Sequence, residues 1–201
     1  MAEPTDANAA RRAAILESAT TVFLRYGFKK TSMDDLARAA GLSRQGLYLH
    51  YPTKDALFKA AVGHLIEASR TAARAALAGD GHDGQAEDLE DRLLAAFIAM
   101  HGHAIGQPGA EHMPELLATT LQILGPVFTD MEAGFVADLA RTLRSAGVAA
   151  TWKPAGVSAK DLAEHLYSAS YGVKHRVTTA AQYREHMQVA VRLVCRGAPS
   201  Q

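Results

Sequence analysis

Two very short helices are predicted one after the other in the first third of the chain. The first begins after Ser32, a residue type that favours the N-cap position, and ends at Gly41. The second begins after Ser43 and must stop near Tyr51, because Pro52 disfavours helical geometry in the residue before it. Two short helices joined by a turn of three or four residues that contains glycine form a helix-turn-helix.

The second short helix carries an unusual set of hydrogen-bonding side chains. In a helix-turn-helix this helix lies in the major groove of DNA. Its exposed face is expected to carry Arg44, Gln45, Tyr48 and His50. Leu47 should point to the core, and Gly46, a poor helix former, should let the backbone approach a phosphate or a base edge. Lys54 opens the next helix, where free N–H groups, the helix dipole and its own charge favour a phosphate.

Apolar spacing and capping residues predict helices in the rest of the chain and no strand. The first helix has an apolar stripe from Ile15 to Tyr26 and ends at Gly27. Ser158 and Thr179 should cap the last two helices. The remaining helices are expected at about residues 54–78, 87–103, 114–124, 126–146, 159–177 and 180–196. The predicted fold class is therefore all-α, with nine helices.

Composition and charge favour a globular protein of a reducing compartment. The chain has 201 residues, 48% of them hydrophobic, and one cysteine, Cys195, which cannot form an internal disulfide. The N-terminus lacks the apolar core of a signal peptide, and the longest uncharged stretch, 93–110, is too polar to span a membrane. We therefore expect a cytoplasmic protein. Residues 1–60 hold nine Lys/Arg against six Asp/Glu, which suits a small basic module on a more acidic body.

Many residues of the first 60 stand at the fixed spacing of a known family. They are Phe23, Tyr26-Gly27, Thr31-Ser32, Leu36-Ala37, Ala40-Gly41-Leu42-Ser43, Gly46-Leu47-Tyr48, His50-Tyr51 and Lys54-Asp55-Ala56-Leu57. Together they resemble the N-terminal DNA-binding domain of the tetracycline-repressor (TetR) family. Tyr51 stands where this family commonly has Phe and is still expected to pack in the core.

The resemblance implies a domain organisation and a mode of action. It implies a nine-helix homodimer with a DNA-binding domain at 1–53 and a ligand-binding and dimerisation domain at 54–201, connected by the helix at 54–78. The dimer would form through the last two helices. Such a protein is a transcriptional regulator, here expected to be a repressor that binds a palindromic operator of double-stranded DNA and is released by a small-molecule effector.

The resemblance also assigns DNA-contacting residues. Arg44 and Gln45 would approach base edges; Gly46, Tyr48, His50 and Lys54 would approach phosphates; and Thr31 or Ser32 would cap the second helix and touch the DNA backbone. The chemistry agrees, because Arg can read guanine and Gln adenine, whereas a Tyr hydroxyl and a Lys ammonium suit phosphate. The alternative is that Tyr48 and His50 are packing residues in a small helical domain.

The effector pocket is expected among large or polar side chains on apolar faces of the C-terminal body. They are Phe97, Met100, His101, Met113, Leu117, Leu121, Phe128, Met131, Phe135, Tyr167 and Tyr171. Their Met and aromatic content suits an adaptable apolar pocket. For any single residue, ordinary core packing is the alternative.

Small and branched residues on the last two helices predict the dimer interface. They are Ala163, Ala169, Ser170 and Gly172 on the first of these helices, and Met187, Val191 and Val194 on the second. Two such helix pairs could form a four-helix contact. A monomer that buries these faces in its own core is the alternative.

No motif indicates a metal, a cofactor or catalysis. His101, His103 and His112 lie near Glu111 and Glu115, but residues two apart on a helix point to nearly opposite sides, and no His-Glu-x-x-His motif is present. A Gly-rich phosphate loop and a Gly-x-Ser-x-Gly motif are also absent from the sequence. The alternative functions are a helical small-molecule-binding or metal-dependent enzyme with a degenerate helix-turn-helix, and an architectural protein that binds DNA without sequence preference.

Overall fold

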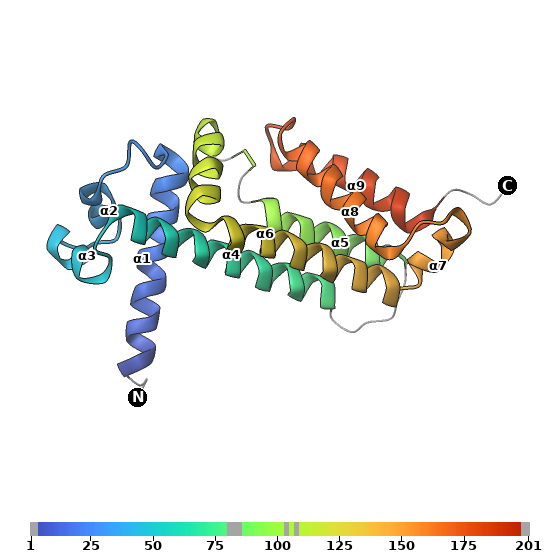
Figure 1. Cartoon of the computed structure of the whole chain (residues 1–201), viewed down its shortest axis with the longest axis horizontal. Helices are drawn as coiled ribbons and strands as arrows, with labels where there is room; N and C mark the ends of the chain where they lie inside the picture. The colour runs from blue at the N-terminus through green and yellow to red at the C-terminus, as the bar shows by residue number, and fades with distance from the viewer. Residues whose placement is uncertain (1–3, 80–85, 103–104, 107–108, 198–201) are drawn as a thin grey trace. The chain divides into compact units, whose positions relative to one another are not determined.

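A computed structural model describes residues 4–79, 86–102, 105–106 and 109–197, and within these ranges the chain is helical, with nine α-helices and no strand (Figure 1). The helices are α1 (Pro4–Tyr26), α2 (Met33–Ala39), α3 (Arg44–His50), α4 (Lys54–Ala78), α5 (Ala86–His101), α6 (Met113–Ser145), α7 (Val148–Trp152), α8 (Ala159–Lys174) and α9 (Ala180–Arg196). Two short 3-10 helices are η2 (Ala110–His112) and η3 (Lys153–Ala155). The predicted fold class is confirmed.

Two details of the helix order differ from the sequence prediction. The expected helices at 114–124 and 126–146 form the single helix α6, which bends at Leu124, where φ is −128° and ψ is 15°. Pro126 causes the bend, because its ring displaces the carbonyl four residues earlier and it has no N–H to donate. Helix α7 was missed, since its five residues are too few to show an apolar period.

The predicted caps are present. Ser32 and Ser158 each accept a hydrogen bond from the backbone N–H of an aspartate three residues on, and each aspartate accepts one from the serine backbone in return. Thr179 accepts from the backbone N–H of Gln182. The caps of α2 and α8 are thus reciprocal, and that of α9 is a single bond; all three satisfy donors that a helix start leaves free.

The described helices form two compact units. The first consists of Met1–Ala68 and Gln107–Thr129, and the second of Ser69–Gly106 and Asp130–Gln201. Helices α4 and α6 contribute to both units. The functional boundary expected after residue 53 stays a prediction.

The first unit has an aromatic centre that positions the helix-turn-helix. Three phenylalanine rings form this centre: Phe23 of α1, Phe28 of the loop after it, and Phe58 of α4. The ring of Phe58 meets each of the other two edge-on, with ring centroids 5.0 Å apart. Leu36 of α2 and Leu47 of α3 are buried in the same core. Helix α2 lies beside α1, and α3 beside α2 (Figure 1).

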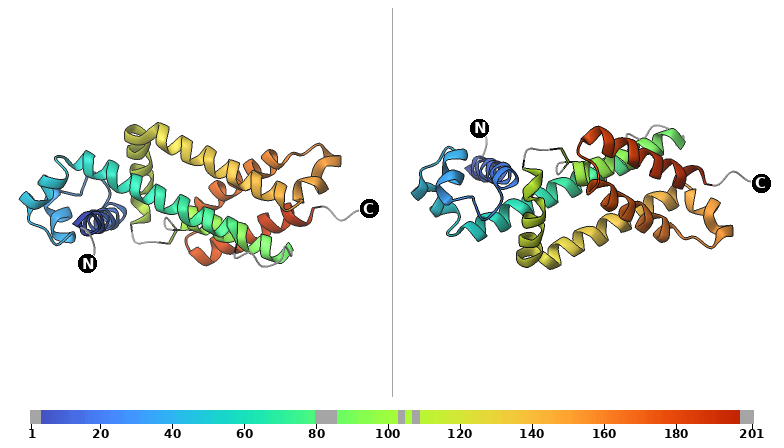
Figure 2. Two further views of the ribbon diagram at one scale, coloured as in Figure 1. Left: turned by 90° about the horizontal axis from the view of Figure 1, so that it is seen from below. Right: turned by 90° about the horizontal axis from the view of Figure 1, so that it is seen from above.

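In the second unit α8 and α9 lie side by side, and α5 packs against α9 (Figures 1 and 2). The carboxylate of Glu90 in α5 forms ion pairs with two arginines of α9. The Nε atom of Arg196 lies 2.8 Å from Glu90 Oε1, and that of Arg192 lies 3.8 Å from Glu90 Oε2. The indole N–H of Trp152 donates to the carbonyl of Val194, which ties the α7 segment to the same helix. Helix α9 therefore contacts α5, α7 and α8 within its own unit.

Candidate functional site

The turn between α2 and α3 is closed by a backbone hydrogen bond to the last turn of α2. Gly41 adopts a φ of +64°, and Leu42 donates its N–H to the carbonyl of Ala37 at 2.9 Å. This six-to-one bond is that of a Schellman cap. Ser43 then caps α3, so that the second helix starts at a fixed angle to the first. The predicted helix-turn-helix is present.

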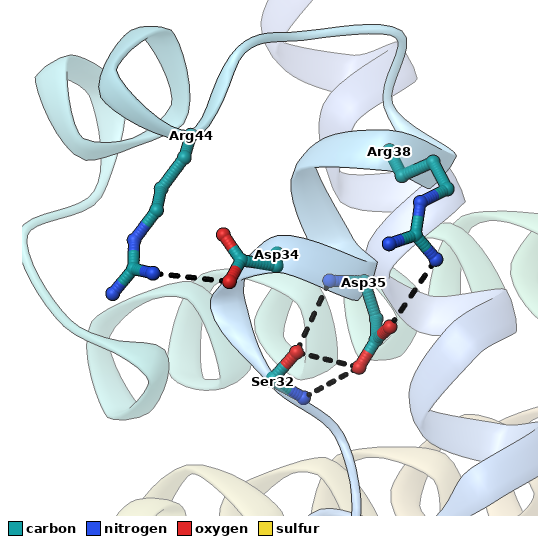
Figure 3. Close-up of polar contacts among 5 residues, drawn as sticks. All are labelled: Ser32, Asp34, Asp35, Arg38 and Arg44. Atoms are coloured by element: carbon teal, nitrogen blue, oxygen red, sulfur yellow. Dashed lines mark hydrogen bonds and ion pairs between the residues drawn. The ribbon is translucent and has the colours of Figure 1, made fainter.

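Arg44, at the start of α3, is held across the motif by α2 (Figure 3). Its Nη1 lies 3.0 Å from Oδ2 of Asp34, and its guanidinium lies 5.7 Å from the centroid of the Tyr48 ring. Both charged side chains are exposed, so the pair contributes little to stability. Because a guanidinium has five N–H donors, a pair through Nη1 leaves donors for a base edge while the side chain is oriented.

The remaining residues of α3 lie mostly as expected. Leu47 is fully buried and Gln45 and Tyr48 are exposed, whereas His50 is half-buried. Gly46 donates its N–H to Oγ of Ser43 at 3.0 Å, and a Cβ at position 46 would lie 3.1 Å from the same oxygen. The cap therefore gives a local reason for glycine there, which the sequence interpretation missed. The approach of Gly46 to DNA stays a prediction.

Thr31 and Ser32 have different environments. Thr31 is buried and its Oγ1 donates to the carbonyl of Gly27 at 2.6 Å, so the structure does not place this hydroxyl at the surface. Ser32 is exposed and forms the capping box of α2 with Asp35. Of the two residues, Ser32 is the one that can both cap α2 and reach a DNA backbone.

The ammonium of Lys54 is turned inward, to the loop of residues 27–32 that joins α1 to α2, called here the α1–α2 loop. Lys54 Nζ donates to the carbonyls of Phe28, at 2.9 Å, and Thr31, at 3.0 Å, and lies 4.4 Å from the centroid of the Phe28 ring. An ammonium has three donors, so two are used by this loop. This structural role was not visible in the sequence; the expected contact with phosphate stays a prediction.

The same loop is held from the other side by the start of α6. Oε1 of Glu115 accepts a hydrogen bond of 2.8 Å from the backbone N–H of Lys29. Gly27 has a φ of +79°, and a Cβ there would lie 3.2 Å from Glu115 Oε2 and 3.3 Å from His112 Cγ. At Gly109 a Cβ would lie 2.2 Å from the carbonyl oxygen of Leu24. Glycine is thus required at Gly109 by the close approach of backbone and is favoured at Gly27 by its positive φ.

In the second unit, buried polar side chains meet between aromatic rings. Nδ1 of His101 lies 2.7 Å from Oγ of Ser170, which lies 2.6 Å from the hydroxyl of Tyr183. These three residues are called the buried polar cluster. Burial raises the pKa of Tyr183 to about 12, so its hydroxyl stays protonated at neutral pH. Of the three residues in this cluster, the sequence interpretation assigned His101 to the pocket and Ser170 to the dimer interface, and it missed Tyr183.

Aromatic side chains predicted for the pocket surround this cluster. The rings of Phe97 and Phe135 meet edge-on at 5.3 Å, and the ring of Tyr167 lies 5.7 Å from that of His101. The hydroxyl of Tyr167 donates to Glu132. Burial, followed by this bond, strongly raises the pKa of Tyr167, which therefore also remains a donor.

The predicted pocket residues fall into two groups. Those in the second unit are Phe97, Met100, His101, Met131, Phe135, Tyr167 and the more exposed Tyr171. Those in the first unit are Met113, Leu117, Leu121 and Phe128. Met113 packs against the core of the first unit, and Leu121 is exposed. Of the residues in the second unit, Phe97 and Tyr167 contact the buried polar cluster and Phe135 packs against both; the pocket itself stays a prediction.

Most of the residues predicted for the dimer interface lie on the buried faces of α8 and α9. Ala163, Ser170, Met187, Val191 and Val194 are buried in the chain's own second unit. Ala169 is half-buried and Gly172 is exposed. The apolar stripe of α9 serves the core, as the alternative interpretation held. Two apolar residues one turn apart on α9 point outward instead: Val189, 55% exposed, and Leu193, 65% exposed.

Comparison with known proteins bears on this geometry. Residues 15–61 match the family described as bacterial regulatory proteins, tetR family. The HTH-type transcriptional repressor Rv1474c of Mycobacterium tuberculosis is 34% identical over 118 residues, which are 56% of this chain and 63% of that protein. The segment at residues 15–61 belongs to the TetR family. The uncharacterized HTH-type transcriptional regulator YfiR of Bacillus subtilis, another relative, is 45% identical over 49 residues, 24% of each chain.

The TetR fold extends beyond the matched segment. A TetR-like transcriptional regulator from Rhodococcus sp. RHA1 has a TM-score of 0.62 over 94% of this chain and 97% of its own, at 24% identity. At that identity the similarity shows the fold alone. Matches to the two curated relatives span 24% and 63% of their lengths. Both relatives are named as HTH-type transcriptional regulators.

Two further findings concern the described residues only. None of the helices within them is long and apolar enough to cross a membrane. Nor do three or more His, Cys, Asp or Glu side chains within the described ranges gather where they could hold a metal ion. His103, one of the histidines considered for metal binding, lies outside these ranges.

Proposed function

We propose that this TetR-family chain is a ligand-responsive DNA-binding transcriptional repressor, which occupies a palindromic operator as a homodimer and leaves it when a small-molecule effector binds. The observation that carries this proposal is the arrangement of α3. Arg44 is oriented by Asp34 beside exposed Gln45 and Tyr48, on a helix that its Schellman turn and N-cap hold in a fixed direction. Such a face suits the major groove.

Each polar residue of this surface has a base or phosphate that fits its chemistry. Arg44 is assigned to a guanine and Gln45 to an adenine, since each can form two hydrogen bonds with that base. Tyr48, His50 and Ser32 are assigned to phosphates, with the N-terminus of α4 at Lys54 as a further phosphate position. Two copies of α3, roughly 34 to 36 Å apart, would enter successive major grooves.

The dimer is assigned to the outward faces of α8 and α9. Val189 and Leu193 form an exposed apolar pair, and Ala190, next to Val189, adds a small side chain. Gly172 offers a small residue on α8. In a two-fold interface the same patch meets itself, so small and branched residues from both copies can interlock.

The effector is assigned to the second unit, around the buried polar cluster. Aromatic and methionine side chains beside a few buried polar groups are typical of small-molecule sites. Effector binding would release DNA only to the extent that the effector binds the DNA-free state more tightly than the DNA-bound state.

The test is an operator selection with purified protein and random duplexes at near-physiological salt. Enrichment of a two-fold palindrome is expected. The matched control is the double variant Arg44→Ala/Gln45→Ala, both of whose positions are exposed and which should lose the enrichment while staying folded. Salt-sensitive binding without enrichment would instead support an architectural protein, and absence of DNA binding would contradict the proposal.

A further inference from the structure

The recognition helix carries one side chain that the polar assignments leave out. Leu49 is 84% exposed, the highest value among the large apolar side chains that the structure describes. It follows Leu47, which is fully buried, by two residues. Because successive residues of an α-helix are about 100° apart, Leu49 points almost directly away from the core of its own domain.

The neighbours of Leu49 are the residues assigned to DNA. Gln45 lies four residues earlier, hence directly beside Leu49 on the helix surface. Tyr48, the preceding residue, is in contact with Arg44. The centre of the outward face of α3 is therefore a pair formed by one amide and one apolar side chain, Gln45 and Leu49.

The fold gives no reason for leucine at this position. A side chain so exposed adds almost nothing to the core, and alanine would form the helix at least as well. Leucine has no hydrogen-bonding group and cannot bind a phosphate. On the major-groove edges of the four base pairs, the apolar group is the C5-methyl of thymine.

We propose that Leu49 is a specificity-determining residue that packs on the C5-methyl group of a thymine in each half of the operator. This inference rests on the proposed function, since it needs α3 in a major groove. Four residues of helix rise about 6 Å, which is roughly two base-pair steps of 3.4 Å. The thymine is expected within about two base pairs of the base that Gln45 reads.

The test removes the methyl group without changing the hydrogen-bonding pattern. In the selected operator, each thymine of a half-site is replaced in turn by deoxyuridine, and the Kd is measured by fluorescence anisotropy. One position should lose affinity about four-fold, the amount for one buried methyl-sized group, and about 15-fold when both half-sites are changed. The other thymines should show smaller effects.

Variants of Leu49 connect that loss to the side chain. Leu49→Ala should bind the thymine and deoxyuridine operators equally, whereas Leu49→Met, which keeps an apolar side chain, should retain the difference. Gln45→Ala is the matched control on the same face: it should weaken binding but keep the penalty for deoxyuridine. Circular dichroism of each variant should match the parent, because both positions are exposed.

Two results would overturn the proposal while leaving the repressor function intact. One is a palindromic operator without a methyl-sensitive thymine. The other is a deoxyuridine penalty that Leu49→Ala retains in full. If the parent protein enriched no sequence at all, the proposed function would fail first, and the assignment of Leu49 would fall with it.

Discussion

Glu115 accepts a hydrogen bond of 2.8 Å from the backbone N–H of Lys29, a residue 86 positions earlier in the chain. The bond links the start of α6 to the α1–α2 loop, which leads directly into the helix-turn-helix. On the other side of this loop, Lys54 at the start of α4 binds two of its carbonyls. The loop is thus held by one acid and one base from two different helices.

Loss of the Glu115 bond should destabilise the first unit. Glu115→Ala is expected to lower the free energy of unfolding by about 1 kcal/mol, because the Lys29 N–H loses its partner. Urea unfolding measures this. The control is Glu111→Ala, which removes a more exposed acid one turn earlier, paired at 3.7 Å with His112, and it should change the stability little. Equal effects of the two substitutions would contradict the role of Glu115.

Lys54→Ala should affect both stability and DNA binding. Removing two hydrogen bonds to carbonyls and a contact with the Phe28 ring should cost about 2 kcal/mol. If the ammonium also reaches a phosphate, operator binding weakens and the slope of log K against log salt falls by about one for each half-site. Lys59→Ala, at an exposed position of α4, is the control. Parental binding by Lys54→Ala at several salt concentrations would refute the phosphate contact.

The Arg44–Asp34 pair should control base preference rather than stability. Arg44→Ala is expected to reduce discrimination at one base pair of the operator by ten-fold or more. Asp34→Ala should weaken the same discrimination less, because the guanidinium is still present but no longer oriented. Binding to operators substituted at each position would show this. Arg38→Ala, which removes the exposed partner of Asp35 at 3.5 Å, should leave base preference unchanged.

The α2 capping box should make the protein sensitive to acid. Hydrogen bonds from Ser32 lower the pKa of Asp35 below its ordinary value of 3.8. Since the folded state favours the carboxylate, this stabilisation is present above that value and is lost as pH falls through the lower folded pKa. Asp35→Asn should therefore flatten the decline of Tm between about pH 5 and 2. Asp130→Asn, an exposed position in α6, should leave the decline as steep as in the parent.

The dimer contact proposed for the outward face of α9 can be tested by placing a charge on that face. Leu193→Arg should convert a dimer into a monomer in sedimentation measurements, because it places two arginines at a two-fold contact. The fold should persist, since Leu193 is 65% exposed. Gln188→Arg, also exposed on α9, is the control and should remain dimeric. A dimeric Leu193→Arg would move the interface elsewhere.

Sequence alone predicted the features that depend on neighbouring residues. Ser32, Ser43 and Ser158 accept hydrogen bonds from N–H groups three positions on, and Gly27 and Gly41 end helices through their own φ angles. Such signals are readable from a short window. The helix-turn-helix, most helix boundaries and the buried Leu47 followed from them.

Features that join distant segments, or need to know which face a helix buries, could not be predicted. Nothing near Lys54 in the sequence indicates that its ammonium turns to the carbonyl of Phe28. The stripe with Met187 is as apolar as an interface would be, and only packing shows that it is core. Leu49 could not be singled out either, because a leucine two residues after Leu47 is equally consistent with a core position until the buried face of α3 is known.

The double attachment of the α1–α2 loop has a mechanical consequence. Helices α4 and α6 both continue from the first unit into the second. A shift of one alone would stretch either the Lys54 bonds or the Glu115 bond, and the other attachment would resist it. When both helices shift together, the loop is carried along intact and takes the start of α2 with it. The two attachments therefore tie the start of α2 to α4 and α6 jointly rather than to either helix alone.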